Sequence, residues 1–147
     1  MGMFNNINTN LTIYKQVTTI PEATVQAMDS IAPYSLITSN NNFYAIPIVC
    51  YIYTLNSTTP YSGFVHLHLT YTGNIGVGYI NSVLSENAIV GGITQSQIYS
   101  FLVNCQQAGF FGGNVTYKNL EIFFDTIPTA GDGDMVVTLF YTKNNRF

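Results

Sequence analysis

The segment FYAIPIVCYIYTL, residues 43–55, carries the clearest structural signal in the chain. Tyr, Ile, Val and Thr dominate it, and β-branched and aromatic residues favour extended strands. Both alternating sets of positions are apolar or aromatic, so neither face of such a strand is suited to water. We therefore expect a long strand that lies inside a sheet or is covered by a partner. The segment contains Pro47 and is shorter than the roughly 20 residues of a spanning helix, so we predict no membrane span.

The same two-residue period recurs along the rest of the chain. Alternating runs begin at Leu11 and follow around residues 34–38, 64–72, 76–83, 115–124 and 135–142, with turn residues between them. Pro21-Glu22-Ala23 predicts a short helical turn, because Pro is favoured in a first turn. The pattern indicates an all-β protein: a two-sheet antiparallel sandwich, jelly-roll-like. An open immunoglobulin-like sandwich is the second choice, and the absence of Trp argues against it.

One segment departs from the strand period. Thr94 and Gln97 match a helix capping box, and Gly109 stands where a helix commonly ends. Apolar residues between them recur at helical spacing: Ile98, Phe101, Leu102 and Cys105. We predict one short inserted helix over about residues 94–108.

A chain of 147 residues suits a single domain with a substantial core. The expected division is a flexible polar N-terminal arm over residues 1–10, a single β-sandwich domain over 11–143, and a short tail over 144–147. The two cysteines, Cys50 and Cys105, fit neither a metal cluster nor a disulfide framework. We expect two buried free thiols.

Charge is scarce, since only 7% of the residues are Asp, Glu, Lys or Arg. Soluble surfaces usually carry about a quarter to a third of such residues, so we expect other protein to cover much of this one, as in a homo-oligomer. The four basic residues are scattered and form no phosphate-binding patch, so we expect no nucleic-acid partner. Tyrosines suit subunit contacts. The candidate interface residues are Tyr44, Tyr51, Tyr53, Tyr71 and Tyr79.

Two short motifs could hold a metal. His66-Leu67-His68 places two imidazoles on one face of a strand, and it is similar to the His-x-His pair of the cupins. The cupin Glu is missing and the chain has no third His, so polar-face histidines are the favoured interpretation. Asp132-Gly133-Asp134 could suggest calcium, but a hairpin loop explains it better. We expect no metal and no cofactor.

Catalytic motifs are also lacking. The chain contains neither a Gly-x-Ser-x-Gly elbow nor a phosphate-binding loop, and no spacing singles out a pair of acidic residues. We therefore predict that the protein is not an enzyme.

A resemblance extends over about residues 17–142. It rests on turn and strand patterns: Thr18-Thr19-Ile20, Ala32-Pro33-Tyr34-Ser35-Leu36-Ile37, Thr58-Thr59-Pro60-Tyr61-Ser62-Gly63, Asn119-Leu120-Glu121-Ile122, and the loop 129–134 before the final strand. In this order the chain resembles small structural proteins of tailed bacteriophages, although residues 84–113 do not match. The resemblance implies a virion component, such as a capsid decoration protein, a head fibre or spike base, or a tail accessory protein. Its partners would be other virion proteins and copies of itself, with a trimer as one arrangement. It supplies no catalytic residue.

A glycan-binding module, such as a receptor-recognition sandwich, is the alternative function. Aromatic rings and amides in loops can form sugar pockets. The candidate contacts are Tyr61, Phe110, Phe111 and Asn114.

Overall fold

A computed structural model describes residues 12–40, 43–64, 66–72, 82–85, 93, 98–102 and 118–145. The expected N-terminal arm, residues 1–10, lies outside this part of the chain. The final strand continues to Asn145, so it runs into the segment expected to be a tail. No helix within the described residues is long and apolar enough to span a membrane.

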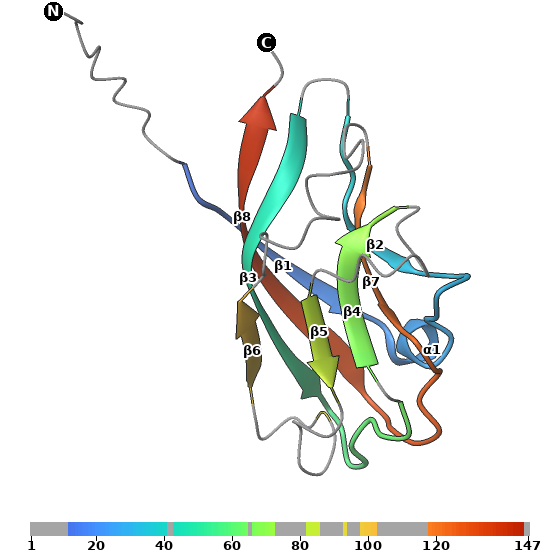
Figure 1. Ribbon diagram of the computed structural model, residues 1–147. Helices are drawn as coiled ribbons and strands as arrows, with labels where there is room; N and C mark the ends of the chain where they lie inside the picture. The colour runs from blue at the N-terminus through green and yellow to red at the C-terminus, as the bar shows by residue number, and fades with distance from the viewer. Residues whose placement is uncertain are drawn as a thin grey trace, which may run out of the picture.

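The described residues form eight strands and one short helix (Figure 1). In chain order these are β1 (Tyr14–Ile20), α1 (Glu22–Val25), β2 (Tyr34–Ile37), β3 (Phe43–Leu55), β4 (His66–Tyr71), β5 (Ser82–Ser85), β6 (Tyr99–Leu102), β7 (Leu120–Phe124) and β8 (Asp134–Asn145). The all-β fold expected from the sequence is confirmed. The strand predicted over residues 43–55 has those bounds in the structure, and the helical turn after Pro21 is α1.

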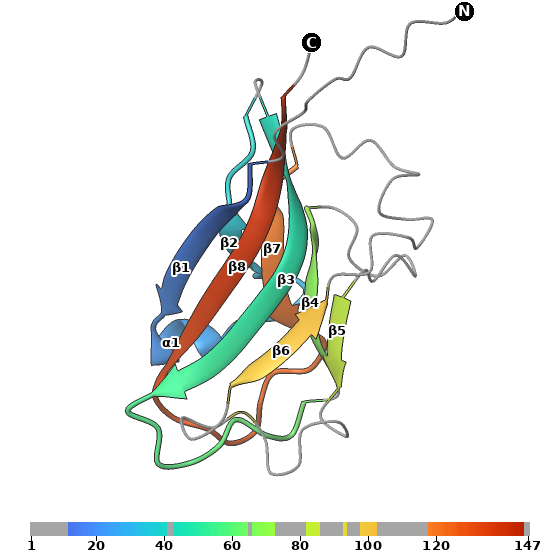
Figure 2. The ribbon, with the colours of Figure 1, turned by 90° about the vertical axis from the view of Figure 1, so that its left-hand side faces the viewer.

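The strands form two four-stranded sheets, which Figure 2 shows one behind the other. Sheet A has the order β1-β8-β3-β6, and sheet B has the order β2-β7-β4-β5. All the strand pairs are antiparallel. The first strand therefore pairs with the eighth, the second with the seventh, the third with the sixth and the fourth with the fifth. This is the pairing pattern of a jelly roll, in which one long antiparallel hairpin is rolled into two sheets.

The core lies between the sheets. Ile52 and Cys50 of β3, Leu139 of β8, and Leu67 and Leu69 of β4 are all essentially inaccessible to water. Successive strand residues point to opposite faces, so these positions define the inward side of each sheet. Residues that are directly opposite each other in neighbouring strands point to the same face of the sheet. Leu139, opposite Cys50, and Ile122, opposite Leu69, therefore also point inward.

The helix predicted over residues 94–108 is wrong where the structure describes that segment. Residues 99–102 form β6, which pairs antiparallel with β3 from Val49 to Ile52. Short apolar runs fit either helix or strand, and here the second edge of β3 offers backbone hydrogen bonds that a helix could not satisfy. The remainder, 94–97 and 103–108, lies outside the described residues.

The loop around Asp132 is not the expected hairpin. It follows β7 of sheet B and precedes β8 of sheet A, so it connects the two layers of the sandwich. A hairpin would require β7 and β8 to be neighbours in one sheet.

Candidate functional site

The outer face of sheet A carries apolar and aromatic side chains with little charge. Three rows of outward-pointing residues cross its strands β1, β8 and β3: Lys15-Phe140-Val49, Val17-Thr138-Tyr51 and Thr19-Val136-Tyr53. Lys15 is the one charged residue in these three described rows. Val17 is 55% exposed and Tyr51 36%, high values for side chains of this kind. In Figure 2 this face is turned toward the viewer, and no described segment crosses in front of it.

Aromatic side chains on this face contact one another and a lysine. The rings of Tyr51 and Phe140 meet edge to face, with centroids 6.0 Å apart. The Lys15 ammonium lies 6.0 Å from the Phe140 ring centroid, at the outer limit of a cation–π contact. These contacts join side chains from three adjacent strands, β1, β8 and β3.

The interface tyrosines predicted from sequence have different positions. Tyr51 and Tyr53 lie on the outer face of sheet A. Tyr71 is wrong as an interface residue, because its side chain is fully buried and its hydroxyl donates to the backbone oxygen of Ala45. Tyr44 lies in β3 with its side chain outside the described part, and Tyr79 is also outside it.

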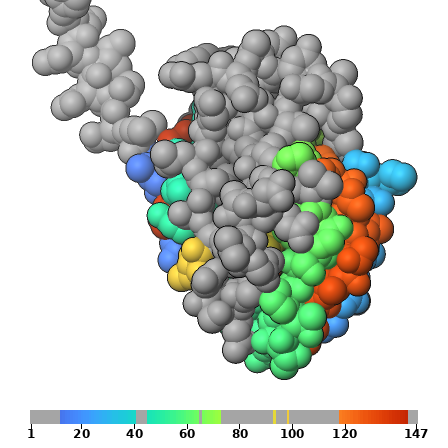
Figure 3. All heavy atoms as spheres, turned by 60° about the horizontal axis from the view of Figure 1, so that its bottom comes forward, coloured from blue at the N-terminus to red at the C-terminus, as the bar shows by residue number. Residues whose placement is uncertain are grey.

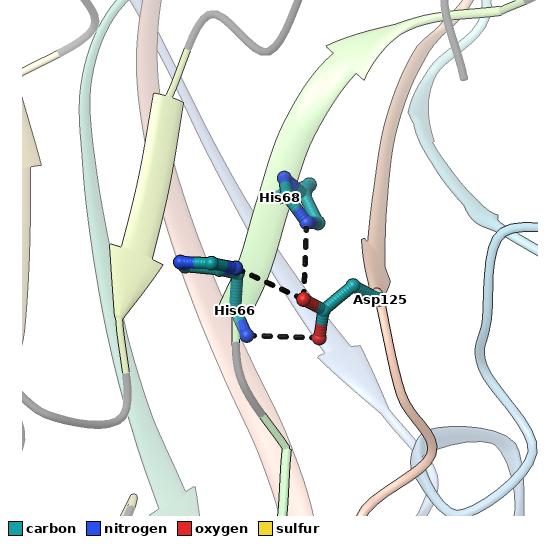
Figure 4. A group of neighbouring side chains, drawn as sticks. All are labelled: His66, His68 and Asp125. Carbon is teal, nitrogen blue, oxygen red and sulfur yellow. Dashed lines mark hydrogen bonds and ion pairs between the residues drawn. The ribbon is translucent and has the colours of Figure 1, made fainter. Parts of the chain in front are cut away.

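A second group of functional side chains lies on the outer face of sheet B, where β4 begins and β7 ends (Figure 4). It contains His66, His68 and Asp125. Nδ1 of His66 is 2.9 Å from Oδ2 of Asp125, and Nε2 of His68 is 3.9 Å from the same oxygen. One ligand atom from each residue falls within 4.8 Å of the others. The structure therefore adds a carboxylate to the His-x-His pair.

His68 is the buried member of this group, at 3% exposure, and its ring stacks on Phe123 with centroids 5.0 Å apart. Burial lowers the pKa of His68, and the neighbouring His66 lowers it further, whereas the charge of Asp125 opposes these effects. The net lowering favours the neutral imidazole, in which one ring nitrogen carries a lone pair.

The Asp132 carboxylate, considered above for calcium, is occupied by hydrogen bonds. It accepts from the backbone amides of Thr58 and Thr59, at 2.6 and 2.8 Å, and from the Thr58 hydroxyl. In Figure 3, which brings this end of the sandwich forward, the green surface of residues 55–64 adjoins the orange surface of β7 and the residues after it. Asp132 thus joins two loops of the fold.

The expected glycan contact at Tyr61 is wrong. Its side chain is fully buried, and its hydroxyl donates to the backbone oxygen of Gly133. Phe110, Phe111 and Asn114 lie outside the described residues. Cys50 is a buried free thiol, as expected, and Cys105 is outside the described residues.

Comparisons of the chain with protein families, with curated proteins and with solved structures found no match. Functional inference therefore rests on the residues themselves.

Proposed function

We propose that this protein is a non-enzymatic structural component of a bacteriophage virion that associates with copies of itself through the outer face of sheet A. The observation that carries the proposal is the apolar and aromatic outer face of sheet A, on which Val17 and Tyr51 are exposed and Tyr53 is partly exposed. The jelly-roll strand order supports it by analogy, because viral capsid domains use this fold, although lectins and cupins do as well.

The charge pattern favours a second copy of the same chain as the partner that binds the outer face of sheet A. Two copies of a strongly charged face would repel each other, but this face carries only Lys15 in its three described rows. Tyr51 and Phe140 offer rigid rings that lose little conformational entropy on contact. Removing such apolar area from water contributes about 25 cal/mol per Å², so a tight interface needs no ion pairs. Association of this kind is weakly sensitive to salt.

Light scattering coupled to size exclusion tests the association, at low and at high salt. We expect a closed oligomer in both conditions. Val17→Lys combined with Tyr51→Lys should dissociate it by placing like charges opposite each other. Ile31→Lys is the matched control, because Ile31 is an exposed apolar residue away from this face, at 89% exposure, and its replacement should leave the oligomer intact.

A wild-type chain that stays monomeric at micromolar concentration would reject the self-association. The virion assignment has a separate test, which is mass spectrometry of purified particles of the encoding phage. The chain should be present in stoichiometric amounts, and its absence from the particles would reject that part of the proposal.

A further inference from the structure

His68 is a buried imidazole that makes no hydrogen bond with the described residues. Its Nδ1 is inaccessible to water and has no partner. Its Nε2 is directed at Asp125, but the 3.9 Å separation from Oδ2 is too long for a direct hydrogen bond. Buried polar nitrogens are almost always satisfied in folded proteins, so an unsatisfied one requires an explanation.

Asp125 is held in a fixed orientation beside this imidazole. Its Oδ1 accepts the backbone N–H of His66 at 2.8 Å, and its own backbone N–H donates to the His66 oxygen at 3.0 Å. These bonds direct Oδ2 toward the space between the two rings, as Figure 4 shows. The carboxylate is therefore positioned by the backbone pairing of β4 with the end of β7, before any ligand binds.

We propose that His66 Nδ1, His68 Nε2 and Asp125 Oδ2 bind one divalent transition-metal ion, for which zinc is the best fit. Zinc bonds of 2.0–2.2 Å in tetrahedral geometry place donor atoms about 3.4 Å apart. The two separations from Oδ2, 2.9 and 3.9 Å, lie on either side of that value. A shift of about half an ångström would bring each of these two separations to that value. The two imidazole nitrogens lie within 4.8 Å of each other, so a bound ion would also draw the partly exposed His66 ring toward His68.

The donor set selects the class of metal. Two imidazole nitrogens and one carboxylate oxygen suit zinc, cobalt or nickel, whereas calcium and magnesium prefer sites made of oxygen. Metal binding requires an unprotonated nitrogen from each imidazole and an ionised carboxylate from Asp125.

Solvent can reach the site from one side. The side chain of His66 is 38% exposed and that of Asp125 is 28% exposed, while His68 closes the inner side. Three protein ligands leave a fourth tetrahedral position, which water can occupy. A bound ion would connect β4 to the residue after β7, and these strands are adjacent in sheet B although they are distant in sequence.

The test uses the full chain after treatment with a chelator and dialysis. Zinc is added, and bound metal is counted by elemental analysis and by competition with a fluorescent zinc indicator. We expect one zinc per chain and a higher Tm in its presence, because a ligand that binds only the folded state stabilises it. Cobalt should give the visible absorption of a tetrahedral site. Excess calcium or magnesium should not displace zinc.

Two variants at partly exposed ligands avoid disturbing the buried ring. His66→Ala and Asp125→Asn should each fold, and each should weaken zinc binding by about 100-fold or more. Asp29→Asn is the control, since Asp29 is a carboxylate elsewhere that accepts backbone amides at Ile31 and Ala32. It should bind zinc as the wild type does. Zinc binding that survives both ligand variants, or equal displacement of zinc by calcium, would overturn the proposal, as would failure of the wild type to bind zinc.

Discussion

The hydroxyl of Tyr61 donates a hydrogen bond of 2.6 Å to the backbone oxygen of Gly133, inside the protein. The ring is enclosed, because a Cβ at the neighbouring Gly131 would lie 2.2 Å from its Cδ1 atom. Tyr61 precedes β4 and Gly133 precedes β8, so one side chain joins the connections that enter the two sheets. Burial raises the pKa of Tyr61 above its ordinary range, and the nearby carboxylates of Glu22, Asp132 and Asp134 raise it further.

Tyr61→Phe should lower the free energy of unfolding by about 1–3 kcal/mol, because the Gly133 oxygen loses its donor while remaining buried. Chemical denaturation measures the change. Tyr51→Phe is the matched control on the outer face of sheet A, where the loss should be within about 0.5 kcal/mol. Equal effects of the two substitutions would contradict the assigned role of the Tyr61 hydroxyl.

Gly133→Ala should destabilise the fold by roughly 2–4 kcal/mol, through backbone strain and steric overlap. Gly133 has a φ of +83°, and an added Cβ would lie 2.3 Å from the backbone oxygen of Leu55. The control is Asn56→Gly, whose free energy of unfolding is measured by the same chemical denaturation. Asn56 also has a positive φ, 55°, which glycine adopts readily, so its replacement should cost less than about 0.5 kcal/mol.

Cys50 should resist thiol reagents in the native protein. Burial raises its pKa from 9.0 to about 12, which reduces the thiolate fraction about 1000-fold at neutral pH, before any steric protection is counted. The measurement compares reaction rates with an aromatic disulfide in buffer and in denaturant, in a Cys105→Ser background that leaves one thiol. A native rate close to the denatured rate would show that the thiol is accessible.

Asp132→Asn should lower Tm at neutral pH but not near pH 2. The hydroxyl of Thr58 and then the amide of Thr59 hold the pKa of Asp132 at about 2, below its ordinary 3.8. Because the folded state binds the proton less readily than the unfolded state, the stabilisation is present above pH about 4 and is lost as pH falls toward 2. Thermal melts of both proteins across this range measure the effect.

Thr58→Val removes the hydroxyl donor and should weaken the same pH dependence. A constant difference in Tm between wild type and Asp132→Asn down to pH 2 would argue against the hydrogen-bonded carboxylate as its source.

Local patterns in the sequence predicted most of the strands, but they missed β6 and the positions of some side chains. The bounds of β3 were predicted correctly because the apolar and aromatic positions on both of its faces run from Phe43 to Leu55. The alternation Leu67, Leu69, Tyr71 already placed Tyr71 with the buried set, so its burial could have been inferred. The opposite set, which begins with His66 and His68, was expected to be polar and solvated, yet His68 is buried.

The long-range contacts were beyond local patterns. Asp125 meets His66 because β4 pairs with β7, and no local signal specifies a pairing between strands so far apart in sequence. The segment around Phe101 was misassigned for the same reason, since its conformation depends on the distant edge of β3.

The order of strands has a consequence for synthesis of the chain. β1 has β8 as its neighbour in sheet A, and β2 has β7 as its neighbour in sheet B. Both pairings join opposite ends of the described chain, and the partner strands β7 and β8 are translated after the other described strands. Sheet A cannot be completed before β8 is synthesised, and sheet B cannot be completed before β7 is synthesised. Until then, β1 and β2 lack their partner strands and their edges are unpaired. Folding is expected to be slow, and chains that are truncated before β7 are expected to aggregate.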